Sequence, residues 1–142
     1  MKTKVYFSRA SIAYPFIFFL FLCVGTYFAR AENWYYQFWY TDIVLHVLSG
    51  AMFASLWLWF VYRRDRTLIR FETLTAVTFA TFGSVLWEFW EFTSWRVLPQ
   101  ISAFYMPEIG DTLGDILCGI VGALIFMIYL YLRKGDKINS NE

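Results

Sequence analysis

Long apolar stretches separated by short polar ones dominate the chain. Four of these stretches are long enough to cross roughly 30 Å of hydrocarbon, which takes about 20 mostly apolar residues in a helix. They cover residues 12–29, 42–62, 71–92 and 111–132. Each stretch should be helical, because lipid offers no hydrogen-bonding partner to an exposed backbone amide. The pattern therefore predicts an all-α, polytopic membrane protein with four transmembrane helices.

The polar segments between these stretches predict the connections. Residues 63–66 form the charged sequence Arg-Arg-Asp-Arg, which is too polar to stay within a bilayer. Residues 94–110 contain Pro99 and Pro107 and predict a loop or a partly embedded connection. Residues 34–40 are almost all aromatic, which is typical of a segment at the membrane–water interface.

Composition supports this prediction and excludes other classes of protein. Hydrophobic residues make up 59% of the chain and charged residues 16%, whereas soluble domains have roughly 45–50% and about 25%. Aromatic residues reach 23%, and the mean hydropathy is +0.48. So apolar a chain is not intrinsically disordered, and a formal net charge of +1 argues against nucleic-acid binding. We expect one integral membrane domain, residues 1–142, whose partner is the lipid bilayer.

The basic residues predict the orientation of the spans. Of the 12 Lys and Arg residues, only Arg30 and Arg96 fall on one predicted side of the membrane. Cytoplasmic segments are enriched in Lys and Arg, so both termini and the middle loop should be cytoplasmic. The basic residues on that side are Lys2, Lys4, Arg9, Arg63, Arg64, Arg66, Arg70, Arg133, Lys134 and Lys137.

The first apolar stretch admits a second interpretation. Its basic start, its apolar run and the Ala29-Arg30-Ala31 sequence at its end resemble a signal peptide with a cleavage site. Cleavage would leave three spans and would not change their orientation. The apolar run is long for a signal peptide, and Tyr27, Phe28 and Arg30 crowd the cleavage position. These features favour a retained first span.

Six ionisable residues lie at or near span ends, where a charged side chain is costly to bury. The predicted topology brings all six to one layer near the extracytoplasmic face. Members of each pair are three or four residues apart and therefore share one face of a helix. The pairs are Asp42 with His46, Glu88 with Glu91, and Asp111 with Asp115.

Small or weakly polar residues continue these faces towards the middle of the spans. Ser49 and Gly50 follow in the second span, Ser84 precedes the pair in the third, and Gly119 and Gly122 follow in the fourth. Membrane helices approach one another closely at such residues. We therefore expect the ionisable groups to point into the bundle.

Charge repulsion then indicates what these groups bind. Five carboxylates and one imidazole cannot all be ionised in a small volume without compensation, and Arg30 and Arg96 are too few to neutralise them. A divalent metal, Zn, Mn or Fe, suits oxygen ligands with one imidazole, and Glu and His side chains on facing helices hold such metals in bundle cores. The predicted metal ligands are Asp42, His46, Glu88, Glu91, Asp111 and Asp115.

Structural roles compete with this interpretation for part of the set. Asp42 and Asp111 each begin a helix, where an acid caps the backbone amides and interacts favourably with the helix dipole. His46 alone also fits a hydrogen-bonded bridge between helices. Both glutamates are harder to explain in this way, because acids at a helix C-terminus oppose its dipole. Asp115 lies a full turn inside its span.

The motifs Asp42-x3-His46-x3-Gly50, Glu88-x2-Glu91 and Asp111-x3-Asp115, followed by a glycine-rich helix, resemble those of small YjdF-like and VanZ-like membrane proteins. The resemblance covers the second to fourth spans. It implies a multi-pass protein of the bacterial cytoplasmic (inner) membrane with a polar site among its helices. VanZ-like proteins are linked to glycopeptide resistance, which implies envelope lipids or wall precursors as substrates. Where VanZ-like proteins typically have an Asn four residues after the last Asp, this chain has Gly119.

Three kinds of function remain open. In an envelope enzyme, the metal would activate water, Glu88 and Glu91 would act as ligands or general base, and Arg96 would hold an anionic head group. In a small transporter, the acids would relay protons or bind cations. In a structural or accessory protein, they would bind a partner or stabilise the bundle. Assembly into an oligomer is compatible with each of the three.

Overall fold

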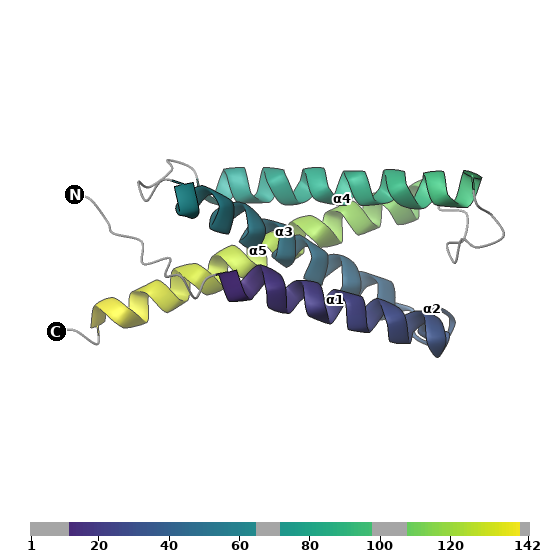
Figure 1. Cartoon of the computed structure of the whole chain (residues 1–142), viewed down its shortest axis with the longest axis horizontal. Helices are drawn as coiled ribbons and strands as arrows, with labels where there is room; N and C mark the ends of the chain where they lie inside the picture. The colour runs from purple at the N-terminus through teal and green to yellow at the C-terminus, as the bar shows by residue number, and fades with distance from the viewer. Residues whose placement is uncertain (1–11, 65–71, 98–107, 140–142) are drawn as a thin grey trace.

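The computed structural model describes residues 12–64, 72–97 and 108–139, and over these ranges the protein is all-α. Figure 1 shows long helices that alternate in direction along one bundle. The beginning of α1 and the ends of α3 and α5 lie at one end of the bundle, and α2 lies at the other. The helices are α1 (Ala13–Ala31), α2 (Trp34–Gln37), α3 (Tyr40–Arg64), α4 (Glu72–Val97) and α5 (Ile109–Asn139).

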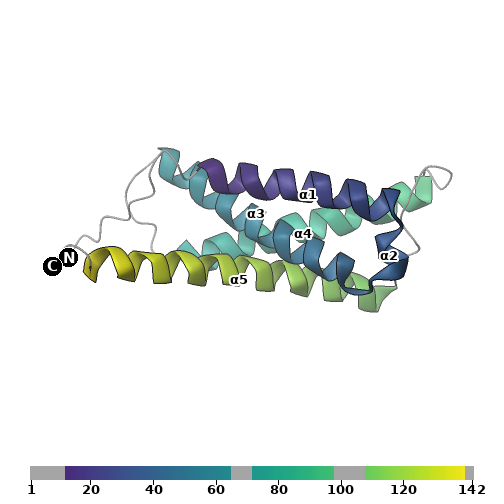
Figure 2. The ribbon, with the colours of Figure 1, turned by 90° about the horizontal axis from the view of Figure 1, so that it is seen from below.

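Helix α3 is the centre of the bundle. It packs against α1, α4 and α5, whereas α1 and α4 lie on different sides of it and have no close backbone contact in the described ranges. Figure 2 shows α1 and α5 on opposite flanks of the bundle. Aromatic side chains still join these two helices, since the ring of Phe126 lies 5.6 Å from that of Tyr14 and 5.7 Å from that of Phe18.

Glycines allow α3 and α5 to approach each other closely. A Cβ atom added to Gly50 would collide with the carbonyl oxygen of Gly119, and one added to Gly122 would collide with that of Val47. Gly119 also faces the hydroxyl of Ser84 on α4. The stripes of small residues seen in the sequence are thus the contact faces of α3, α4 and α5.

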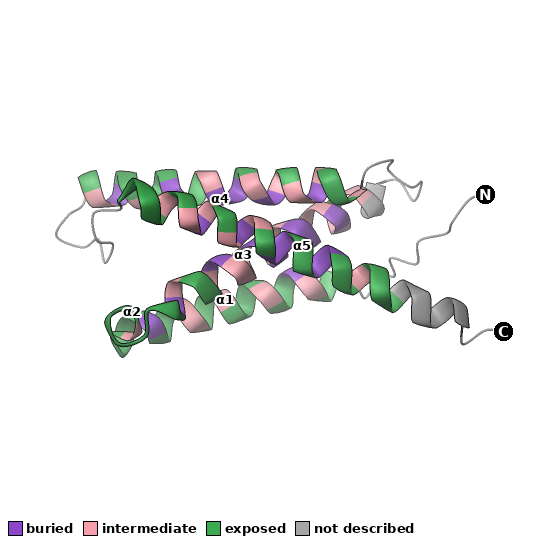
Figure 3. Cartoon of the chain, turned by 180° about the vertical axis from the view of Figure 1, so that it is seen from behind, coloured by how far each residue is buried: buried purple, intermediate pink, exposed green. Residues whose placement is uncertain are grey.

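Burial follows the same contact faces. The buried apolar core is made mostly of small side chains, among them Ala51, Ala54, Ala80 and Ala123. Large apolar side chains such as Phe16, Phe82 and Leu117 point outward and are more than half exposed. Figure 3 shows the buried positions turned inward and the outer helix faces exposed. This arrangement suits a protein surrounded by lipid.

Three helices are long and apolar enough to cross a membrane: Ala13–Ala31, Tyr40–Val61 and Ile109–Arg133, with mean hydropathies of 1.5, 1.8 and 2.2. They correspond to the first, second and fourth predicted spans. Helix α4 corresponds to the third, but its threonines and glutamates make it less apolar than the others. The third predicted span, and with it a total of four, stays a prediction, as does the orientation of the termini.

All four long helices extend beyond the predicted spans, and α4 and α5 extend farthest. Helix α4 continues to Val97, past the predicted start of the connection at Ser94, because no glycine or proline lies between Ser94 and Pro99. Helix α5 continues beyond Leu132 to Asn139 through a polar segment that contains Arg133, Lys134 and Lys137. The rest of the predicted connection, residues 98–107, lies outside the described residues.

Candidate functional site

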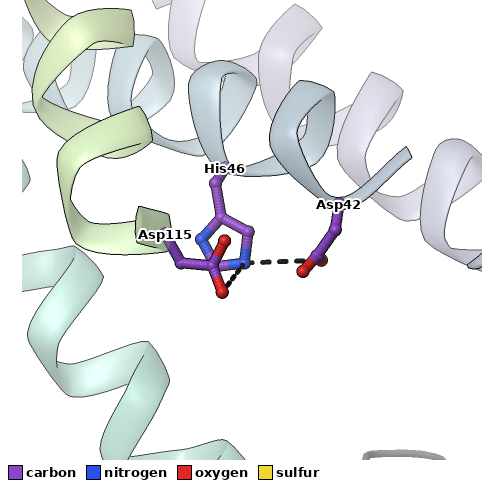
Figure 4. A group of neighbouring side chains, drawn as sticks. All are labelled: Asp42, His46 and Asp115. Atoms are coloured by element: carbon purple, nitrogen blue, oxygen red, sulfur yellow. Dashed lines mark ion pairs between the residues drawn. The ribbon is translucent and has the colours of Figure 1, made fainter. Parts of the chain in front are cut away.

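Asp42 and His46 on α3 and Asp115 on α5 form a compact group (Figure 4). Nε2 of His46 lies 3.6 Å from Oδ1 of Asp42 and 3.7 Å from Oδ2 of Asp115. One possible ligand atom from each residue lies within 4.8 Å of the others. His46 is 4% exposed and Asp115 6% exposed, while Asp42 is half-buried at the edge of the group.

The close approach of α3 and α5 brings these short side chains together. His46 and Gly50 are one helical turn apart on α3, and Asp115 and Gly119 are one turn apart on α5. Because Gly50 and Gly119 have no side chains, the backbones meet there, directly below the group. The close contact of α3 and α5 therefore lies one helical turn from the site and holds His46 and Asp115 near each other.

Glu88 brings a third carboxylate from α4. Its Oε1 lies 3.9 Å from Nδ1 of His46, and the residue is 6% exposed. This oxygen is buried and has no hydrogen-bond partner within the described part of the chain. A buried polar atom without a partner is unfavourable, and a proton or a bound cation would remove this cost.

The two ring nitrogens of His46 therefore face different groups. Nε2 faces the two aspartates, and Nδ1 faces Glu88. A neutral imidazole has one donor nitrogen and one acceptor nitrogen. Metal-binding histidines commonly donate the N–H of the non-ligating nitrogen to a carboxylate, which fixes the ring orientation. The arrangement around His46 has this form.

The other predicted site residues are not members of this compact group. Glu91 is half-buried, and its Oε1 accepts a 2.8 Å hydrogen bond from the indole N–H of Trp87, one turn earlier on α4. Asp111 is exposed in the first turn of α5. Arg96 is exposed in the last turn of α4. Among the described residues, Asp42, His46 and Asp115 thus offer ligand atoms within 4.8 Å of one another and Glu88 lies near His46, whereas a site role for Glu91, Asp111 and Arg96 stays a prediction.

A cavity of about 820 Å³ borders the group, and it extends between α1, α3 and α4. Its inner part is apolar, with Phe19 and Leu22 from α1 and Met52 and Phe53 from α3. No motif in the sequence indicated this cavity, because it forms where α1 and α4 both pack against α3 without close backbone contact between them in the described ranges. Its apolar residues are indistinguishable in sequence from those that face lipid.

The other end of the cavity is polar. Asp42 and His46 line it together with Arg30, Tyr35 and Glu91. Partial burial, together with the nearby carboxylates of Asp42 and Glu91, raises the pKa of Tyr35 to about 12, although Arg30 acts to lower it. The phenol therefore keeps its proton at neutral pH and can donate a hydrogen bond into the cavity.

Comparison with known proteins places the chain in a family. Residues 1–136 match the family described as predicted membrane protein (DUF2238). Neither a curated protein nor a solved structure matches the chain. The YjdF-like and VanZ-like resemblances stay predictions. Because the match extends over nearly the whole sequence, the chain belongs to the DUF2238 family of predicted membrane proteins.

Proposed function

We propose that this chain is a multi-pass protein of the bacterial cytoplasmic membrane that binds a divalent metal ion through Asp42, His46 and Asp115. The observation that carries the proposal is the placement of Nε2 of His46 3.6 and 3.7 Å from two carboxylates. In a tetrahedral site with metal–ligand bonds of about 2.1 Å, ligand atoms lie about 3.4 Å apart. Small side-chain rotations would close the group around an ion.

Glu88 supplies the independent support. Its buried Oε1 lacks a hydrogen-bond partner in the described residues and points at Nδ1 of His46. With an ion on Nε2, the ring carries its proton on Nδ1 and donates it towards Glu88. We therefore propose that Glu88 positions the imidazole of His46. In this proposal Glu91 and Asp111 do not coordinate the ion.

The ligand types favour a transition metal. One imidazole and two carboxylates suit Zn, Mn or Fe, whereas Ca and Mg prefer sites built from oxygen alone. Three protein ligands leave a coordination position open, as is usual for metals that act in catalysis. Such an ion activates water and polarises a phosphoryl or acyl oxygen. The proposed activity is metal-dependent hydrolysis or modification of an envelope lipid at the outer face of the membrane.

Hydrogen bonds below the site favour this enzyme function over transport. Ser49 donates to the carbonyl of His46 at 2.8 Å, and Ser84 donates to that of Ala80 at 3.1 Å. Thr81 likewise donates to the carbonyl of Val77. Each hydroxyl is thus bound to its own helix. These side chains do not form a polar path from the site towards the other end of the bundle.

Metal analysis of the full chain purified in detergent tests the proposal. We expect about one equivalent of a transition metal in the unmodified protein, with nearly complete loss in both His46→Ala and Asp115→Asn. Asp111→Asn is the matched control, because it neutralises an exposed acid one turn away on the same helix. No metal in the folded, unmodified protein, or equal loss in the Asp111 variant, would contradict the assignment.

A further inference from the structure

We propose that the cavity between α1, α3 and α4 binds a membrane lipid with a phosphate head group, with one hydrocarbon chain in the apolar part and a phosphate oxygen at the metal. This inference rests on the proposed metal site and names the class of ligand that the site takes. Three features of the cavity support this inference. It has an apolar and a polar half, Arg30 lines its polar half, and it shares Asp42 and His46 with the metal group.

The inner half of the cavity suits a hydrocarbon chain. Phe19, Leu22, Met52 and Phe53 line it, and these side chains offer no hydrogen bonds to a polar ligand. The volume of about 820 Å³ lies within the roughly 300–1,000 Å³ of small-molecule sites. In a bilayer, the molecules that reach such a space between helices are lipids, and an acyl chain fills it at little energetic cost.

The polar half places the head group at the metal. Asp42 and His46 belong both to the metal group and to the cavity wall, so an ion bound there borders the cavity. Arg30 is the only Lys or Arg among the described residues that line the cavity. Phosphate offers oxygen ligands to the ion and a planar pair of acceptors to a guanidinium, and the protonated Tyr35 adds a donor.

Charge makes this binding depend on the metal. Without an ion, the carboxylates of Asp42 and Glu91 outnumber Arg30 in the cavity wall, and they repel a phosphate. A divalent ion compensates the charges of Asp42 and Asp115, and Arg30 then offsets Glu91. A phosphate-headed lipid should therefore bind only to the loaded protein, whereas a lipid with a cationic head group should prefer the metal-free protein.

The test measures lipid and metal in the same sample. The full chain in detergent is mixed with phosphatidic acid, or with diacylglycerol of the same chains, and retained lipid and metal are quantified by mass spectrometry. We expect phosphatidic acid to be retained at least about tenfold more than diacylglycerol. We also expect a chelator to remove this preference and the added metal to restore it. Excess inorganic phosphate should compete only weakly, because it lacks the chain.

Two pairs of variants locate the ligand. Leu22→Trp fills the apolar half of the cavity, and Leu20→Trp is its control, because Leu20 is 53% exposed and does not line the cavity. Arg30→Gln removes the cationic group at the head-group end, and Arg133→Gln changes an exposed arginine outside the cavity. Each cavity variant should lose about tenfold in phosphatidic acid retention at unchanged metal content, and neither control should.

The outcomes separate the two proposals. Metal bound normally but no preference for phosphatidic acid would overturn the lipid inference and leave the metal site standing. Stronger lipid retention after chelation, or equal losses in cavity and control variants, would overturn it as well. Absence of metal from the folded protein would overturn the metal site and, with it, this inference.

Discussion

The two sides of α3 show opposite kinds of packing. Towards α5, Gly50 and Gly119 bring backbone against backbone, and an added Cβ atom has no space. Towards α1, a Cβ added to Gly25 would lie 3.1 Å from a side-chain carbon of Leu45, and a large cavity follows along the interface. The comparison shows a division of roles: the tight side sets the positions of the ionisable groups, and the loose side leaves room for a ligand. His46 lies where the two meet.

Gly50→Ala should produce the largest effect, because its methyl group would collide with the backbone of α5, which cannot rotate away. Overpacking of this kind costs about 1–3 kcal/mol and sometimes more. We expect a strongly lowered unfolding temperature in detergent, followed by circular dichroism, together with loss of bound metal. Gly114→Ala is the control, since no atom lies within 4 Å of the added carbon. Equal stability of the two variants would contradict the tight interface.

Glu88→Gln should weaken metal binding without removing a ligand. An amide accepts the Nδ1 proton of His46 less strongly than a carboxylate does, so we expect about 10–100-fold lower metal affinity. Metal titration of the stripped protein measures this change. Glu91→Gln provides the matched control on the same helix, because Glu91 pairs with Trp87 instead. A comparable loss in both variants would mean that Glu88 has no particular role at His46.

Gly25→Ala should change the stability of the protein very little, in contrast to Gly50→Ala. The atom that the new methyl group meets is the end of the Leu45 side chain, and this can move into the adjacent cavity. Replacing glycine by alanine also favours a helix by about 1 kcal/mol. The change in unfolding temperature should therefore be small or positive. A loss as large as that of Gly50→Ala would show that the α1 interface is tight as well.

Tyr35→Phe should have the smallest effect, and only at high pH. The pKa of Tyr35 is raised to about 12 in the folded protein, against about 10 for an unfolded chain. The native state therefore holds this proton more tightly, and its contribution to stability is complete below pH 10 and declines as the pH rises towards 12. Unfolding in detergent at pH 8 and at pH 11 should show a decline that is smaller in the variant. An identical decline in both proteins would contradict the raised pKa of Tyr35.

Much of the fold follows from local sequence. Apolar runs of sufficient length predict helices because a backbone in lipid must bond to itself, and three of the four predicted spans coincide with helices apolar enough to cross a membrane. The positions where the helices end were less predictable from the sequence. Helices α4 and α5 continue to Val97 and Asn139 because a helix forms its own backbone hydrogen bonds, so the end of an apolar run does not require the helix to stop.

The candidate site was also predictable from the sequence only in part. Spacings of three or four residues place each ionisable pair on one helix face, so the sequence alone indicated that Asp42, His46, Glu88 and Asp115 share a layer. The sequence did not distinguish Asp115 from Asp111, because both lie on the same face of the helix. In the structure, Asp115 lies one turn further along α5, where this helix contacts α3.

Side-chain partners across helices depended on tertiary structure throughout. Glu88 faces His46 while Glu91 pairs with Trp87, and this choice is set by the rotation of α4 against Gly119, where Ser84 makes contact. The cavity likewise exists because α1 and α4 both pack on α3 and not on each other. Helical periodicity is a local property that the sequence determines, whereas the rotation and spacing of neighbouring helices result from the packing of all of them together.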